Sequence, residues 1–218
     1  MLRNAPATAR ATDPVLIHGF VCRIINKSWR SRTIVALHGS GADETTLLPF
    51  ARAVDPDAGI VAPRGRIDQN GERRWFLKHS PICFDQASIR TEAAAFAVFV
   101  RKLADFETVD PGRTVFIGYS NGGNLVHATM MLHADVVRTA ILLRCMPVLA
   151  RAQMSDLSEC EVLCVRGGAD ETYRSFAAPL AAQLRRRGAS VALRTVTADH
   201  MLGDEDVAVA RRWLGRIK

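Results

Sequence analysis

The stretch Gly118-Tyr119-Ser120-Asn121-Gly122-Gly123 gives the clearest local signal in the chain. It follows the apolar run 114–117 and precedes the helix-like run 124–132, so Ser120 is expected on a tight turn between a buried strand and a helix. Glycines two residues before and after the serine let the backbone make that turn without steric clash. The helix start adds free N–H groups and a positive dipole end beside the hydroxyl. The alternative is a glycine-rich turn that carries no chemistry.

Short apolar runs alternate with helical patterns through most of the chain. The expected strands are 15–25 (one strand, broken or bent at Gly19), 33–37, 59–62, 114–117, 138–143, 161–166 and 190–196, and the expected helices are 44–54, 87–106, 124–132, 175–187 and 204–217. Asp43 is expected to cap the first helix, and 66–83 is expected to be an irregular loop. The alternation predicts an α/β fold with a mostly parallel central sheet flanked by helices. We expect residues 1–218 to form a single domain, with 1–13 as a flexible terminus.

Composition and charge argue against several classes of function. The chain has 218 residues, of which 48% are hydrophobic and 23% charged, and a formal net charge of +7. The basic residues are scattered, and the one dense run, Arg185–Arg187, ends a helical pattern, where cations need no partner. Nucleic-acid binding is therefore not expected. No run approaches the roughly 18 apolar residues of a membrane span, and no signal-peptide core is present. We expect a cytoplasmic protein, with a weak resemblance of the N-terminus to a transit peptide as the alternative.

The five cysteines do not suggest a disulfide framework or a metal site. Their number is odd and most lie in apolar, strand-like surroundings, which favours reduced, buried thiols. Cys160 and Cys164 are four residues apart, but no His/Cys cluster lies near them in the sequence. No phosphate-cradling or dinucleotide-binding motif is present, so we expect neither a metal nor a cofactor.

Ser120, Asp170 and His200 follow three of the expected strands, in that order. Functional residues of such sheets gather at the carboxyl ends of the strands. A serine hydroxyl needs a base within hydrogen-bond reach, and the base needs an acid to hold its tautomer. We therefore predict Ser120 as nucleophile, His200 as base and Asp170 as acid. The other candidates are less well placed; for the acid they are Asp199, Asp156 and Glu171, and for the base His18, His38, His79, His127 and His133.

A tetrahedral oxyanion also needs preorganised N–H donors. The backbone N–H of Asn121, directly after the nucleophile, should be one of them. The other should come from the loop His38–Gly41 after the strand 33–37, where Ser40 N–H is the natural candidate. Gly39 and Gly41 would allow a substrate to approach this loop closely.

With these residues in place, the sequence resembles the α/β-hydrolase superfamily, and within it the phospholipase/carboxylesterase family, which includes acyl-protein thioesterases and small bacterial carboxylesterases. The matching pieces span most of the chain; they are 37–44, 62–65, Arg74-Trp75-Phe76, 118–124, 168–170 and Asp199-His200. The resemblance implies an α/β-hydrolase fold without a large cap domain. It also implies that Trp75 and Phe76 border the substrate pocket. Two departures are a short segment before His38 and the run Ala198-Asp199-His200 where the family usually has His-Gly.

The implied function is a serine hydrolase that cleaves small carboxylic esters through an acyl-enzyme on Ser120. A thioesterase or lysophospholipase with the same triad is the near alternative. A dienelactone hydrolase is less favoured because that family has cysteine where Ser120 stands. A non-catalytic binding module on the same fold is the alternative from another class, and a homodimer is an open option.

Overall fold

The computed structural model of the protein describes residues 12–25, 32–105, 109–151 and 155–217. Its centre is an eight-stranded sheet with the spatial order β1-β2-β4-β3-β9-β10-β11-β12. These strands are β1 (Val15–Ile17), β2 (Phe20–Ile25), β3 (Thr33–Leu37), β4 (Gly59–Pro63), β9 (Thr114–Tyr119), β10 (Thr139–Leu143), β11 (Glu161–Gly167) and β12 (Ser190–Val196). The six from β4 to β12 are parallel, whereas β2 pairs antiparallel with β1 and β4. The mostly parallel α/β sheet expected from the sequence is confirmed.

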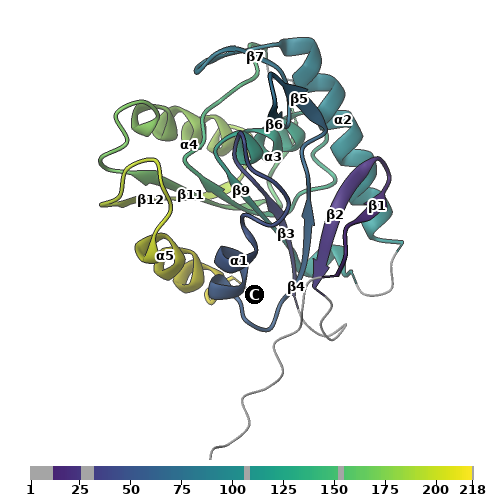
Figure 1. The fold of residues 1–218 in the computed structure, drawn as a ribbon. Coiled ribbons are helices and arrows are strands. Elements are labelled where there is room, and N and C mark those ends of the chain that lie inside the picture. The colour runs from purple at the N-terminus through teal and green to yellow at the C-terminus, as the bar shows by residue number, and fades with distance from the viewer. Residues whose placement is uncertain (1–11, 26–31, 106–108, 152–154, 218) are drawn as a thin grey trace, which may run out of the picture.

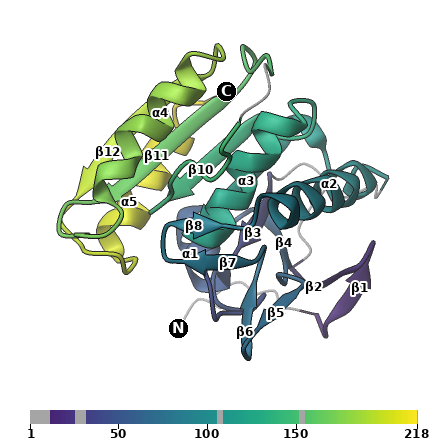
Figure 2. The ribbon, with the colours of Figure 1, turned by 90° about the horizontal axis from the view of Figure 1, so that it is seen from above.

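Helices cover both faces of this sheet (Figure 1). They are α1 (Leu48–Val54), α2 (Gln86–Leu103), α3 (Asn121–Leu132), α4 (Ala177–Arg185) and α5 (Asp204–Leu214), with short 3-10 turns at Pro111–Arg113 and Arg174–Phe176. Figure 2 shows α2, α3 and α4 on one face, with α1 and α5 on the other. No helix in the described ranges is long and apolar enough to cross a membrane.

The strands contribute side chains alternately to two hydrophobic clusters, one on each face. In β9, Phe116 packs in the cluster under α2, α3 and α4, whereas Val115 and Ile117 pack in the cluster under α1 and α5. In β10, Leu142 packs in the first of these clusters and Ile141 in the second. The sheet is therefore buried on both faces, which explains why its inner strands read as continuous apolar runs.

The segment 15–25 is a hairpin of two strands, so the expectation of one bent strand was wrong. Its turn residues His18 and Gly19 have φ angles of 43° and 84°. Two successive residues with positive φ reverse the chain in a tight hairpin turn, so β1 and β2 pair antiparallel. The expected flexible terminus, 1–13, lies mostly outside the described residues.

The first helix begins later than the sequence suggests. Asp43 does not cap it: its carboxylate accepts hydrogen bonds from the backbone N–H and the hydroxyl of Thr45, at 2.9 and 2.6 Å. Such a local bond closes a turn and competes with helix formation. The helix α1 therefore starts only at Leu48, with Pro49 in its first turn, where the missing proline N–H has no cost.

The segment 66–83 is ordered into two small hairpins, not an irregular loop. The first pairs β5 (Ile67–Gln69) with β6 (Glu72–Arg74), and the second pairs β7 (Lys78–Ser80) with β8 (Cys83–Phe84). Strands of two or three residues are too short to show an alternating pattern in the sequence. Asn70 and Gly71, both at positive φ, form the turn between β5 and β6.

Candidate active site

The Ser120 turn has the geometry that its sequence predicts. Ser120 lies between β9 and α3 with φ 50° and ψ −116°, a strained conformation for a residue with a side chain. A side chain at Gly118 would clash with the backbone of Gly123, and one at Gly122 would clash with the carbonyl group of Leu37. The glycines thus allow β9, α3 and β3 to approach closely enough to hold Ser120 at the carboxyl end of β9.

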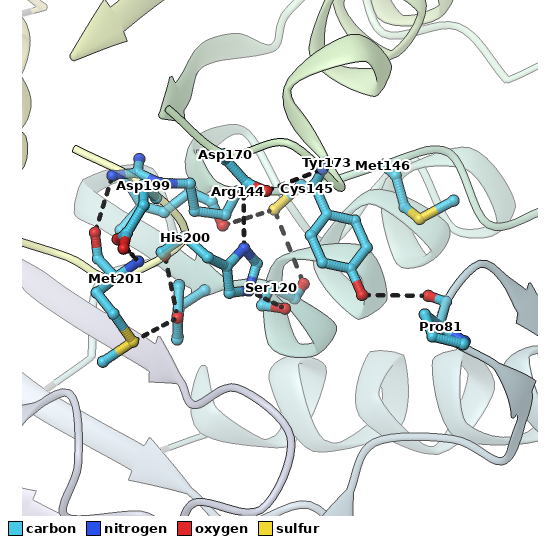
Figure 3. Close-up of polar contacts among 12 residues, drawn as sticks. Pro81, Ser120, Arg144, Cys145, Met146, Asp170, Tyr173, Asp199, His200 and Met201 are labelled. Atoms are coloured by element: carbon cyan, nitrogen blue, oxygen red, sulfur yellow. Dashed lines mark hydrogen bonds and ion pairs between the residues drawn. The ribbon is translucent and has the colours of Figure 1, made fainter. Parts of the chain in front are cut away.

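Ser120, His200 and Asp170 are brought together from three loops (Figure 3). The Ser120 Oγ lies 3.2 Å from His200 Nε2, and His200 Nδ1 lies 2.7 Å from Asp170 Oδ2. A carboxylate only accepts hydrogen bonds, so Nδ1 carries the proton and Nε2 is left to accept from the serine hydroxyl. Asp170 is buried, while the His200 side chain is about one third exposed. The three residues therefore form a continuous chain from a buried acid to an accessible hydroxyl.

Asp170 and His200 are each held by further contacts. The second carboxylate oxygen of Asp170 accepts a hydrogen bond from Tyr173 N at 2.9 Å. The His200 ring lies between the rings of Tyr119 and Tyr173, with centroid distances of 5.4 and 4.8 Å. Burial raises the pKa of both tyrosines, so they remain neutral at pH 7. The Tyr119 hydroxyl donates to the His200 carbonyl oxygen at 3.1 Å.

The competing acid and base candidates have other roles. Asp199 accepts a hydrogen bond from Met201 N at 2.7 Å, and its carboxylate points away from the His200 ring (Figure 3). His38 is buried; its Nε2 accepts from Gly65 N at 2.9 Å, which ties the loop after β3 to the chain after β4. His127 is fully buried within α3.

The backbone amides of Ser40 and Asn121 have no hydrogen-bond acceptor within the described part of the chain. Adjacent groups in both loops are bonded. Gly41 N donates to Arg73 O at 2.8 Å, and the Asn121 side-chain oxygen accepts from Trp75 N at 2.8 Å. The two amides are thus free to donate to a bound group, while hydrogen bonds hold the atoms beside them in place.

Trp75 and Phe76 do not present their rings to a substrate. Both side chains have no exposed surface, which contradicts the expectation that they border the pocket. The Trp75 ring packs against Phe20 and Phe96, and its indole N–H donates to the His38 carbonyl oxygen at 2.8 Å. Aromatic residues next to a site are often structural supports, and the sequence alone does not separate the two roles.

Sequence reasoning missed Arg144, which follows β10. Its guanidinium is fully buried and forms a two-pronged ion pair with Asp206 at 2.8 and 3.0 Å. It also donates to the carbonyl oxygens of Asp199 and Met201, at 2.7 and 3.1 Å. These residues flank His200, so Arg144 holds the loop that carries His200. A charged residue directly after a buried strand was the available signal.

An apolar hollow of about 440 Å³ lies between α1 and α5. Its wall includes Tyr119 and Met201, the chain neighbours of Ser120 and His200. Leu47, Phe50 and Val207 supply further apolar surface. Among the described residues, no group of three or more His, Cys, Asp or Glu side chains is arranged to hold a metal ion.

The chain is similar to known hydrolases over most of its length. A carboxylesterase from Mesorhizobium loti is 41% identical; the match covers 95% of this chain and 99% of that one, with a TM-score of 0.90. The Bacillus cereus carboxylesterase is 25% identical, with 90% and 94% covered and a TM-score of 0.85. MhqD of Bacillus subtilis (strain 168), a protein classed by name with the hydrolases, is 28% identical over 199 residues, which are 87% of this chain and 96% of that protein.

No model of a known protein family matches the sequence. Near-complete coverage at 41% identity nevertheless establishes common descent and a shared fold with a carboxylesterase. The chain therefore belongs to the α/β-hydrolases of the phospholipase/carboxylesterase type, and it is a carboxylic ester hydrolase.

Proposed function

We propose that Ser120 is the nucleophile of this esterase, His200 its general base and acid, and Asp170 the acid that orients His200. The observation that supports these roles is the chain of two contacts, 3.2 Å from Ser120 Oγ to His200 Nε2 and 2.7 Å from His200 Nδ1 to Asp170 Oδ2. The base lies within reach of the hydroxyl proton, and the buried carboxylate fixes the tautomer that leaves Nε2 free.

The reaction would proceed in two halves. Ser120 Oγ attacks the ester carbonyl carbon while His200 Nε2 takes the hydroxyl proton. The tetrahedral intermediate then collapses, and the bond to the alcohol oxygen breaks as that oxygen takes the proton from His200. Water, deprotonated by His200, next attacks the acyl-enzyme; the second intermediate releases the acid and returns the proton to Ser120. Asp170 stabilises the imidazolium in each half.

We assign the oxyanion site to the backbone N–H groups of Ser40 and Asn121. Both amides are unpaired in the described structure, while the adjacent Gly41 amide and Asn121 side chain are bonded. Donors fixed before the reaction stabilise the developing negative charge without further reorganisation. Losing one such donor typically costs about 10²–10³ in turnover.

We further propose that the hollow between α1 and α5 takes the apolar part of a small ester. Its volume of about 440 Å³ lies within the usual range for small-ligand sites. Tyr119 and Met201 connect its wall to the catalytic loops. This hollow replaces Trp75 and Phe76 as the candidate substrate pocket, because those rings are buried.

We further propose that the protein is a single domain and acts in the cytoplasm. It is supported by five cysteines that are all free thiols, four of them buried, as expected in a reducing compartment. Gel filtration with light scattering would distinguish a monomer from the homodimer that the sequence leaves open.

The roles are tested by hydrolysis of nitrophenyl esters of increasing acyl length by wild type and Ser120→Ala. We expect wild type to be active, with a maximum at short chains, and Ser120→Ala to lose at least about 10³-fold in kcat. Ser155→Ala, which removes a serine hydroxyl bonded to Met131 O, is the matched control and should keep near wild-type turnover. A Ser120→Ala variant with wild-type activity would overturn the assignment. Parallel assays with acyl thioesters and lysophospholipids identify the alternative substrates.

A further inference from the structure

Arg74, in the strand β6, has a buried guanidinium group directly behind the Ser40 loop. Its side chain is 6% exposed. Its NH1 donates to the Ser40 hydroxyl oxygen at 2.8 Å, and its NH2 pairs with the carboxylate of Glu72. The Glu72 side chain is about half exposed, so water screens its charge more than that of Arg74. The guanidinium thus brings a buried positive charge to Ser40, and its other terminal nitrogen pairs with Glu72.

The chemistry of this contact fixes the role of the Ser40 hydroxyl. An arginine side chain has only donors, whereas a hydroxyl has one donor and two acceptor lone pairs. Ser40 Oγ is therefore the acceptor in the bond with Arg74, and its own proton is left to donate elsewhere. Among the described residues nothing accepts that proton, and Ser40 is exposed. A charged donor on the oxygen strengthens the hydroxyl as a donor in turn.

The Ser40 hydroxyl lies close to the proposed oxyanion site because the backbone N–H of the same residue belongs to that site. The Ser40 N–H is one of the two proposed oxyanion donors, and Oγ is only three bonds away from that nitrogen. The segment Arg73–Trp75 fixes the surroundings, because Arg73 O accepts from Gly41 N and Trp75 N–H donates to the Asn121 side chain. The charge of Arg74 also acts on Tyr173, whose ring packs against His200: burial and Asp170 raise the pKa of Tyr173, and Arg74 lowers it.

We propose that the Ser40 hydroxyl is a third oxyanion donor, and that Arg74 is the positioning residue that orients and polarises it. This inference rests on the proposed Ser120 mechanism. Three donors instead of two would contact the negative oxygen of each tetrahedral intermediate. Because the contact forms with the oxyanion, its loss should lower kcat and leave KM nearly unchanged.

The test compares five variants with wild type on a short nitrophenyl ester: Ser40→Ala, Ser40→Thr, Arg74→Met, the double variant Ser40→Ala/Arg74→Met, and Arg73→Met. We expect Ser40→Ala to lower kcat about 10-fold to 100-fold with KM changed less than about twofold. Affinity for a trifluoromethyl ketone, which forms the tetrahedral adduct with the enzyme, should fall by a similar factor. Ser40→Thr keeps a hydroxyl and should recover most of the activity.

Arg74→Met should lower kcat about 10-fold, and the double variant should be no slower than Ser40→Ala, because Arg74 acts through the hydroxyl. Arg73→Met is the matched control: it makes the same change one residue earlier, at a 43% exposed side chain. It keeps the backbone carbonyl that accepts from Gly41 N and should stay within about twofold of wild type.

Three results would overturn the inference: wild-type kcat for Ser40→Ala, no recovery in Ser40→Thr, or multiplicative losses in the double variant. An inactive wild type, or an active Ser120→Ala variant, would instead overturn the proposed mechanism. Failure of the two proposals is therefore distinguishable.

Discussion

The loop that carries His200 is anchored by a buried ion pair, whereas the loop that carries Ser40 is anchored by backbone hydrogen bonds and an arginine whose acidic partner is exposed. Arg144 and Asp206, behind His200, have no exposed side-chain surface. Arg74, behind Ser40, pairs with a half-exposed Glu72. In the proposed mechanism His200 gains and loses a charge in every cycle and needs a rigid support. In the proposed mechanism the Ser40 amide must stay unpaired for the substrate, so the loop is held instead at the Ser40 hydroxyl and at the Gly41 amide.

Breaking the ion pair behind His200 should have the largest effect on stability. Arg144→Met removes the two-pronged bond and leaves the Asp206 carboxylate buried without its cation, which should cost about 3–5 kcal/mol in free energy of unfolding. Urea denaturation measures this cost. The control Arg101→Met breaks an exposed pair with Asp135 and should cost less than about 1 kcal/mol.

The double variant Arg144→Met/Asp206→Leu sharpens this test. It removes both buried charges and should recover part of the stability, but not the activity, because the carbonyl groups of Asp199 and Met201 lose their donor. Equal stability losses for Arg144→Met and Arg101→Met would contradict the proposed anchor.

Acid stability should depend on His127, in the helix α3 that begins directly after Ser120. Burial lowers the pKa of His127 from 6.5 to about 4. Between these values the unfolded chain binds the proton and the folded chain does not, so stability falls as pH falls from 6.5 to 4, by about 3 kcal/mol. Urea denaturation at pH 7 and pH 4.5 measures the fall. In His127→Met this contribution should disappear, and an unchanged pH dependence would show that His127 does not titrate in this way.

Two buried asparagines of α3 allow a comparison between a position next to the proposed oxyanion site and a position farther along the helix. The Asn121 side chain accepts from Trp75 N and the Asn124 side chain from Met146 N, at 2.8 and 2.9 Å. Either change to alanine leaves a buried N–H unpaired, so each should cost about 1–3 kcal/mol in urea denaturation. Only Asn121→Ala should also lower kcat, by about 10-fold, because Trp75 fixes the turn next to the proposed donor. Equal kcat values for the two variants would argue against this support.

The smallest expected effect is at Tyr173. Tyr173→Phe keeps the ring beside His200 and removes the hydroxyl that donates to Pro81 O at 3.3 Å. This bond is exposed, so its loss should cost less than about 1 kcal/mol and change kcat less than about threefold. Steady-state kinetics and urea denaturation check both values. A tenfold loss of kcat would mean that the β7–β8 hairpin is held over the site by Tyr173.

The proximity of Ser120, Asp170 and His200 could be predicted from the sequence because each lies in a loop that follows a strand. The carboxyl ends of parallel strands lie on the same side of the sheet. Ser120, Asp170 and His200 could therefore be predicted to lie close together without knowledge of any contact. The same reasoning located Ser40. The order of strands and helices was equally accessible, because buried strands and amphipathic helices have different periods.

The supporting residues could not be predicted because they act over long sequence separations. Arg144 meets Asp206 across 62 residues, and Arg74 meets Ser40 across 34. Nothing in a local pattern pairs them. Asp43 failed as a helix cap because its local turn with Thr45 competes with a helix start. Trp75 was misplaced because an aromatic residue near a site can face either the core or the substrate.

The most direct test of the proposed mechanism is to locate the covalent intermediate. The protein is incubated with a fluorophosphonate, digested, and mapped by mass spectrometry, with the His200→Gln variant in parallel. We predict one modified residue, Ser120, and labelling of His200→Gln slowed at least about 10²-fold because the base is lost. A label on another residue, or an active esterase whose Ser120 stays unmodified, would contradict it.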